Sequence, residues 1–122
     1  MIILVVDDLR LFPNEMEGNI VHHEVSSRGA IKFLEENFSM ISDIFLDFYL
    51  GGKDTTMPVV NWLWKKAEKG QANHICSIRI ITSSPTGAQK IATLSRYFYI
   101  GPRPQHIDIR GFQNSINTSV NQ

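Results

Sequence analysis

Met1-Ile-Ile-Leu-Val-Val-Asp-Asp8 is the stretch that decides the predicted fold, because a short and unbroken apolar run ends there in two acids. Apolar runs rich in β-branched residues are typical of strands that are buried on both faces, as in a parallel sheet. Two later apolar runs also end in polar residues: residues 44–46 run into Asp47, and residues 78–81 run into Thr82. The sequence therefore predicts a parallel sheet with polar side chains at the carboxyl ends of three strands.

Three helices are predicted to alternate with these strands, since each has residues suited to a helix start and an apolar face behind them. They begin at Ser26–Ser27, at Thr55–Thr56 and at Pro85–Gly87, and the second ends near Gly70. Residues 19–25 and 106–110 are expected to add two weaker strands, and residues 9–18 are expected to form a loop. Alternating strands and helices predict an α/β fold of three layers, in which the first helix is shortened or missing.

The composition is that of one globular domain. A chain of 122 residues is long enough to bury one core and too short for a tandem arrangement. Residues 1–110 are assigned to this domain, and residues 111–122 are assigned to a polar and flexible C-terminal tail that is rich in Asn, Ser and Gln.

The charge balance limits the classes of partner. Lys and Arg number 12, and Asp and Glu also number 12, so no overall field attracts nucleic acid or an anionic membrane. No apolar run reaches the roughly 18 residues that a membrane-spanning helix needs. The single cysteine, Cys76, cannot form an internal disulfide. We therefore expect a cytoplasmic protein with neither a membrane nor a nucleic-acid partner, in which any anion site is local.

The acids at the strand ends predict a metal site. In a parallel α/β sheet, ligands bind outside the carboxyl ends of the strands, where Asp7, Asp8 and Asp47 fall. Three carboxylates that converge in a partly dry cleft raise a pKa or recruit a divalent cation, for which Mg²⁺ is the natural candidate. Thr82, Ser83 and the N–H groups that lead into the helix at Gly87 are predicted to hold phosphate oxygens.

Three separated segments resemble the receiver domains of response regulators, and most closely the cyclic-phosphate processing receiver domain family. Asp7-Asp8-Leu9-Arg10 resembles the family's Asp-Asp-x-Arg start. Ile44-Phe-Leu-Asp-Phe-Tyr-Leu-Gly51 resembles its Leu-Asp-His-Asp-Leu-Gly signature, and Ile81-Thr-Ser-Ser-Pro-Thr-Gly87 resembles its His-Ser-x-Asn-Pro-x-Gly signature. The resemblance covers roughly residues 1–95.

The resemblance implies a receiver-like, flavodoxin-type sheet and assigns roles to its matching residues. Asp7, Asp8 and Asp47 would hold the metal, and Asp47 would be the nucleophile that accepts a phosphoryl group. Thr82 would rearrange to hold a phosphoryl oxygen and so shift the nearby surface between two states. A phosphodonor or a protein partner is implied as well, while the oligomeric state is left open.

The chain departs from the family pattern at positions that carry acid–base chemistry. Phe48 and Tyr49 stand where the first signature has His-Asp, and Ile81 stands where the second signature has His. A typical receiver also has a Lys at the end of its fifth strand, but no Lys occurs after Lys90. Arg103 and Arg110 are the candidates to replace it, with a planar fork in place of a compact ammonium.

Three functions are weighed on these residues. The first is a regulatory receiver-like protein that binds metal and phosphate at the aspartates. The second is a metal-dependent hydrolase of a cyclic phosphate, which loses support because both signature histidines are replaced. The third is a degenerate receiver that acts only through protein contacts, which the missing Lys favours.

Overall fold

The computed structural model describes residues 1–102. The strand that the sequence predicts over residues 106–110, both candidate arginines Arg103 and Arg110, and the expected boundary between residues 110 and 111 lie outside the described residues.

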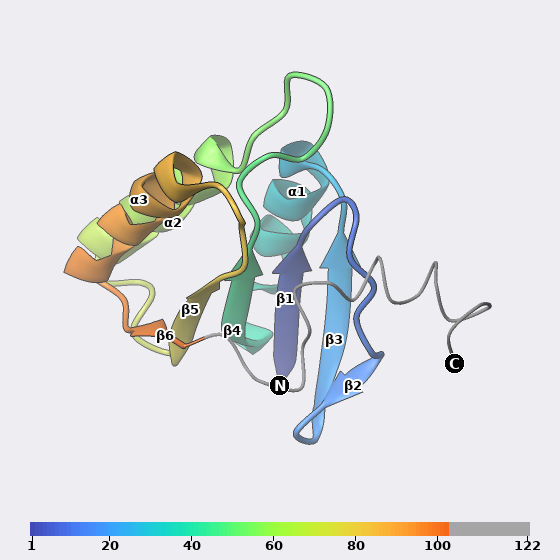
Figure 1. Cartoon of the computed structure of the whole chain (residues 1–122). Coiled ribbons are helices and arrows are strands. Elements are labelled where there is room, and N and C mark those ends of the chain that lie inside the picture. The colour runs from blue at the N-terminus through green and yellow to red at the C-terminus, as the bar shows by residue number, and fades with distance from the viewer. Residues whose placement is uncertain (103–122) are drawn as a thin grey trace.

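A six-stranded sheet forms the centre of the molecule (Figure 1). Its strands are β1 (Ile2–Val6), β2 (Glu15–Met16), β3 (Asn19–Glu24), β4 (Ile41–Leu46), β5 (Ser77–Ile80) and β6 (Ile100–Gly101), in the spatial order β2-β3-β1-β4-β5-β6. All neighbours pair in parallel except β2, which pairs antiparallel with β3. Without β2, the order 2-1-3-4-5 is that of flavodoxin-like folds, so the predicted sheet is confirmed.

Three helices connect the parallel strands: α1 (Ser27–Asn37), α2 (Met57–Glu68) and α3 (Pro85–Ala92). Ser26 caps α1, because its side chain accepts the Gly29 N–H at 3.0 Å. Short 3-10 turns over residues 38–40 and 93–96 end α1 and α3. No described helix is long and apolar enough to cross a membrane.

The main core lies on the face of the sheet that the three helices cover. Strand side chains alternate between the two faces, so Leu4 and Val6 of β1 point toward the helices, whereas Ile3 and Val5 point away. Within residues 1–102, the second face is covered by the segment of residues 9–18, whose Phe12 and Met16 pack in the smaller cluster, and not by a helix. The prediction that the first helix is shortened or missing is therefore confirmed, since no helix lies between β1 and β3.

Two elements differ from the sequence prediction. The segment of residues 9–18, expected to be a loop, contains the two-residue strand β2. The last described strand is β6, a two-residue strand that the sequence did not predict, and its Ile100 pairs with Ile78 of β5. It ends before Pro102, which has no N–H to donate to a neighbouring strand.

Candidate functional site

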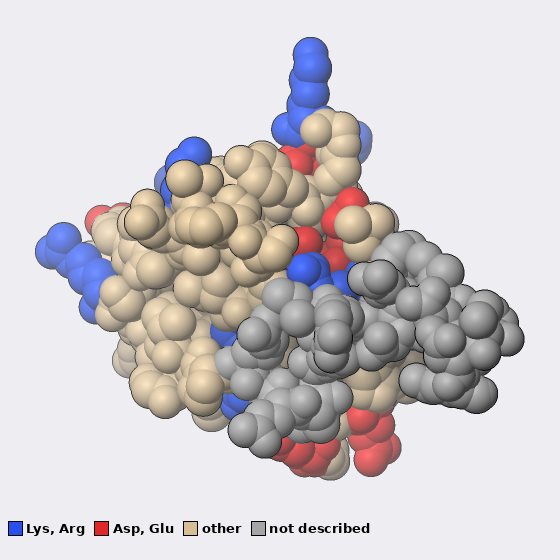
Figure 2. Space-filling view, in the orientation of Figure 1, with Lys and Arg blue, Asp and Glu red and all other residues tan. Residues whose placement is uncertain are grey.

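The acids meet where the order of the strands reverses. Asp7 directly follows β1 and Asp47 directly follows β4, and these two neighbouring strands form the switch point of the sheet. The Asp47 N–H donates to the Val6 carbonyl at 2.9 Å, which keeps the two strand ends level. Acidic side chains gather at this edge of the molecule, with basic atoms beside them (Figure 2). Ligands bind at such switch points in open α/β sheets.

Asp7, Asp8 and Asp47 form one cluster, which we call the acid pocket. Each offers a carboxylate oxygen, and the three oxygens all lie within 4.8 Å of one another. Asp7 is fully buried and Asp47 is 7% exposed. Like charges at this separation in a poorly hydrated place repel strongly, so the pocket needs a compensating cation.

A turn of the chain holds Asp7 in place. Its Oδ1 accepts the N–H groups of Leu9 at 2.8 Å and of Arg10 at 3.0 Å, as in the first turn of a helix. The His23 ring donates to the Asp7 carbonyl from β3. Because Pro13 lies soon after and the sequence lacks a helical apolar face, this turn does not continue as a helix.

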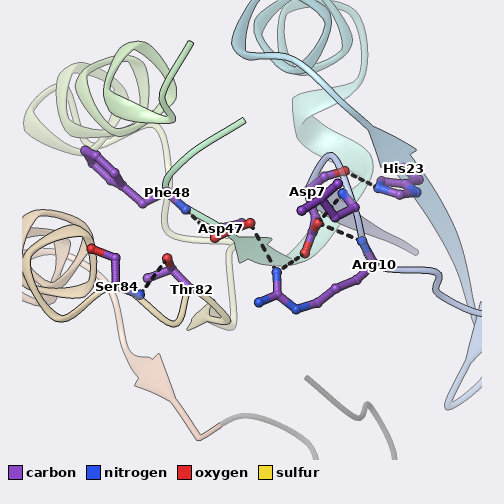
Figure 3. Close-up of polar contacts among 8 residues, drawn as sticks. Asp7, Arg10, His23, Asp47, Phe48, Thr82 and Ser84 are labelled. Carbon is purple, nitrogen blue, oxygen red and sulfur yellow. Dashed lines mark hydrogen bonds and ion pairs between the residues drawn. The ribbon is translucent and has the colours of Figure 1, made fainter. Parts of the chain in front are cut away.

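Arg10 supplies positive charge to the pocket, as Figure 3 shows. Its Nη1 donates to Asp7 Oδ2 at 2.7 Å and to Asp47 Oδ2 at 3.1 Å, so one guanidinium nitrogen bridges two strand ends. Burial opposes the charge on Arg10, but the Asp7 hydrogen bond and the charges of Asp7 and Asp47 outweigh it and raise the Arg10 pKa above its ordinary value. No contact of Arg10 was predicted from the sequence, and the Asp-Asp-x-Arg spacing points only to its neighbour Asp7, not to Asp47.

Asp8 is the least satisfied of the three acids. Its Oδ1 is buried and has no hydrogen-bond partner among the described residues. Burial raises the Asp8 pKa above its ordinary value, and the charges of Asp7 and Asp47 add to this effect, while its own backbone N–H and Arg10 oppose it. Gly51 lies close by, and a Cβ on it would stand 3.1 Å from Asp8 Oδ2. With a φ of 93°, this position also favours glycine, so the loop can approach Asp8 closely.

Phe48 and Ile81, which replace the two signature histidines, both lie in the core. Phe48 is 2% exposed and its ring points away from Asp47 (Figure 3). It packs against α3, where a Cβ on Gly87 would come within 2.6 Å of Phe48 Cβ. Ile81 is buried on the opposite face of the sheet with Phe45 and Val5. Neither position presents a polar atom to the acid pocket. Only the backbone of Phe48 contributes, since its N–H donates to Asp47 Oδ1 at 2.8 Å.

The predicted phosphate-binding residues lie after β5, the strand beside β4. Thr82 Oγ1 accepts the Ser84 N–H at 3.3 Å, and Ser83 is exposed. The Gly87 N–H donates to Ser84 Oγ at 3.1 Å, so the helix cap already uses it. Figure 3 shows Asp47 between Thr82 and Arg10, with no hydrogen bond between Thr82 and Asp47. The structure thus brings the three acids together and leaves Thr82 beside Asp47 without a hydrogen bond to it.

The residues of the acid pocket fit a magnesium ion. Mg²⁺ prefers oxygen ligands at about 2.1 Å in an octahedron, which sets opposite ligands about 4.2 Å apart. The three oxygens span at most 4.8 Å, and the buried Asp8 Oδ1 still needs a partner. Asp7, Asp8 and Asp47 would hold the ion, which would neutralise the acids and present open positions to a phosphate.

The fold and the pocket together define a receiver-like α/β domain with its acids at the switch point. Residues 2–96 match the family model of the cyclic-phosphate processing receiver domain, which is more than half of the 122 residues. The chain therefore belongs to this family. No curated protein and no solved structure matches it.

Proposed function

We propose that this protein is a regulatory receiver-like domain that binds a divalent metal ion and a phosphate group at the acid pocket. The observation that carries the proposal is the meeting of three carboxylates within 4.8 Å, two of them buried, beside one bridging guanidinium. Three negative charges against one positive charge destabilise the fold, so their presence at a switch point favours a ligand-binding role.

Asp47 is the residue that we propose as phosphoryl acceptor. A carboxylate oxygen of Asp47 would attack the phosphorus of a phosphodonor, and the bond from phosphorus to the leaving group would break with its electron pair. The leaving group takes up a proton, and Asp47 becomes an acyl phosphate. A bound Mg²⁺ would supply charge stabilisation to the phosphoryl oxygens. The Phe48 N–H donates to Asp47 Oδ1 and Arg10 Nη1 donates to Oδ2, so the attacking oxygen must first lose one of these hydrogen bonds.

Thr82 would carry the change to a protein partner. Its hydroxyl accepts a single hydrogen bond of 3.3 Å from Ser84 and lies after the strand next to Asp47. A turn of this side chain toward a phosphoryl oxygen would break that bond and disturb the start of α3, where Ser84 is the cap. Such a local change, spread through one packed element, is how phosphorylation reaches a partner surface.

Hydrolysis of a cyclic phosphate is the less supported function. It needs a general acid at the scissile bond, and both signature histidines are replaced by side chains in the core, Phe48 and Ile81. Tyr49 is 54% exposed and is the remaining phenol in this segment. Because the family is described by the processing of cyclic phosphates, we propose cyclic phosphates as ligands to test beside a phosphodonor.

The test is metal and phosphate binding by the whole chain. Calorimetry and thermal unfolding would follow titration with Mg²⁺ alone and with Mg²⁺ plus beryllofluoride, a mimic of the phosphoryl group. We expect saturable binding and a higher Tm, because a ligand that binds the native state stabilises it. Asp47→Asn should abolish the response to beryllofluoride and weaken that to Mg²⁺.

Glu36→Gln is the matched control, since it removes the same charge from the exposed face of α1. It should bind as the unsubstituted protein does. Identical titrations for Asp47→Asn and Glu36→Gln would contradict the proposal. Incubation with 2′,3′-cyclic AMP and Mg²⁺ tests the second function, since release of a nucleoside monophosphate that Asp47→Asn abolishes would establish hydrolysis.

A further inference from the structure

The guanidinium of Arg10 occupies the oxygens that a metal ion would need. Asp7 Oδ2 and Asp47 Oδ2 both accept from the same nitrogen, Nη1, at 2.7 Å and 3.1 Å. The other oxygens of these two acids are held by backbone N–H groups, Oδ1 of Asp7 by Leu9 and Arg10 and Oδ1 of Asp47 by Phe48. The pocket-facing oxygens are therefore the ones that Arg10 holds.

We propose that Arg10 exchanges between two partners: its guanidinium leaves Asp7 and Asp47 when a divalent cation binds there, and then binds the oxygens of the phosphate group. Arg10 thus blocks the empty pocket and becomes the anion-binding residue of the loaded pocket. The inference rests on the proposed function. It adds that Arg10 competes with the metal ion for the two carboxylates, and that Arg10 is the residue that binds the phosphate.

The backbone around Arg10 permits this exchange. The Arg10 N–H is fixed to Asp7 Oδ1 at 3.0 Å, so its Cα stays beside the pocket when the side chain turns. The Arg10 side chain is 12% exposed, so it is not sealed in the core. A guanidinium and a divalent cation repel each other when they share the same two carboxylates. The Arg10 guanidinium must therefore leave these oxygens when the cation binds.

The described residues place no other cation on these acids. The ion pairs of Asp7 and Asp47 within residues 1–102 are both with Arg10. The last described strand, β6, ends at Gly101 directly before Pro102, so no basic side chain stands at this strand end. Arg79 of β5 is held elsewhere, because its Nε donates to Ser77 Oγ and its Nη1 donates to the Pro102 carbonyl. Arg10 is therefore the described cation that already contacts both of these acids.

The proposal predicts opposite effects of one substitution on cation and anion binding. Arg10→Met should tighten Mg²⁺ binding at least about tenfold, since the metal then meets a pocket with no bound competitor. The same variant, saturated with Mg²⁺, should bind beryllofluoride at least about tenfold more weakly, because a charged hydrogen-bond donor is lost. Arg28→Met removes an exposed arginine of α1 and is the matched control, which should change neither affinity.

A measurement on the unsubstituted protein shows directly whether Arg10 leaves the acids. It distinguishes this movement from the loss of a positive charge that a substitution causes, and it does not depend on the folding of a variant. Arginine side-chain N–H signals in nuclear magnetic resonance spectra would be followed during Mg²⁺ titration, with Arg79 as internal reference. We expect the Arg10 signal to lose its protection from exchange on Mg²⁺ binding and to regain it with beryllofluoride, while the Arg79 signal stays unchanged.

The outcomes distinguish this inference from the proposed function. An Arg10 signal that stays protected at saturating Mg²⁺, or an Arg10→Met variant that binds Mg²⁺ no more tightly, would overturn the exchange while the metal site stands. Beryllofluoride affinity that is unchanged in Arg10→Met would overturn its role toward the phosphate. Absence of Mg²⁺ binding in both the unsubstituted protein and Arg10→Met would overturn the proposed function and the exchange together.

Discussion

Asp43 in β4 and Asp47 directly after β4 lie in two polar sites that differ in the charge around the aspartate. At one site, Ser77 Oγ donates to Asp43 Oδ2 at 2.5 Å and in turn accepts from Arg79 Nε at 3.1 Å. We call these three residues the Asp43 cluster. At the other site, just beyond the end of β4, Asp47 shares the acid pocket with two further carboxylates.

The difference lies in the balance between acids and donors. The Asp43 cluster has one carboxylate, one hydroxyl and one guanidinium, so its charges balance, and the hydroxyl and the guanidinium both donate within the cluster. The acid pocket has three carboxylates and one guanidinium, and Asp8 Oδ1 has no partner among the described residues. A balanced polar group stabilises a fold, whereas an unbalanced one costs stability. The comparison favours a structural role for Asp43 and supports the ligand-binding role that we propose for Asp47.

The largest difference in stability is expected between two single variants, each of which removes the arginine of one site. Arg10→Met should destabilise the metal-free protein by about 3–5 kcal/mol, because it leaves buried Asp7 beside uncompensated like charges. Arg79→Met should cost only about 1 kcal/mol, because Ser77 still satisfies Asp43. Urea unfolding of both variants measures this. Equal losses of stability in the two variants would contradict the comparison. Saturating Mg²⁺ should restore much of the stability of Arg10→Met and should not restore that of Arg79→Met.

A smaller effect, of opposite sign at the two sites, is expected from isosteric removal of one negative charge. Asp43→Asn should destabilise by about 1 kcal/mol, since the hydrogen bond from Ser77 loses its charged acceptor. Asp8→Asn should stabilise the metal-free protein by up to about 1 kcal/mol, because it relieves repulsion that Arg10 only partly offsets. Free energies of unfolding, measured without divalent cations, give both signs, and a destabilised Asp8→Asn variant would contradict the unbalanced pocket.

The smallest effect is a dependence on pH. The Asp8 pKa is raised in the folded state, mainly by burial, above its ordinary value of 3.8. The folded state therefore holds more protons than the unfolded state in this range, and the contribution of Asp8 to stability falls as the pH rises from 3.8 through the raised pKa. The stability advantage of Asp8→Asn over the unsubstituted protein should grow with pH over this window. An advantage that is constant from pH 4 to pH 7 would show that Asp8 is not strained.

The sequence predicted the parts of the fold that local patterns determine. The apolar run before Asp7, the cap at Ser26 and the missing first helix are visible in a few neighbouring residues, and all three are confirmed. The two-residue strand β6 was not predicted, because it exists only through its pairing with β5. A strand that short leaves no pattern of its own.

For the candidate site, the sequence predicted the meeting of the three aspartates but not the contacts that surround them. The meeting of the three aspartates follows from strand ends that share one edge of the sheet. The contact of Arg10 with Asp47 joins residues 37 positions apart and depends on the finished fold, so the Asp-Asp-x-Arg spacing alone did not indicate it. Gly87 was expected to serve phosphate binding through its N–H, but its lack of a side chain also makes room for Phe48. Sequence patterns do not separate these two uses of a glycine.

The most direct test of the central claim is to map where a divalent cation binds. Mn²⁺, which prefers the same oxygen ligands as Mg²⁺, broadens the amide signals nearest to it. With substoichiometric Mn²⁺, we expect the strongest broadening at Asp8, Arg10 and Phe48, much weaker broadening at Asp43, and loss of the effect in Asp47→Asn. Broadening centred on the Asp43 cluster or on the exposed acids of α1, and unchanged in Asp47→Asn, would contradict the account.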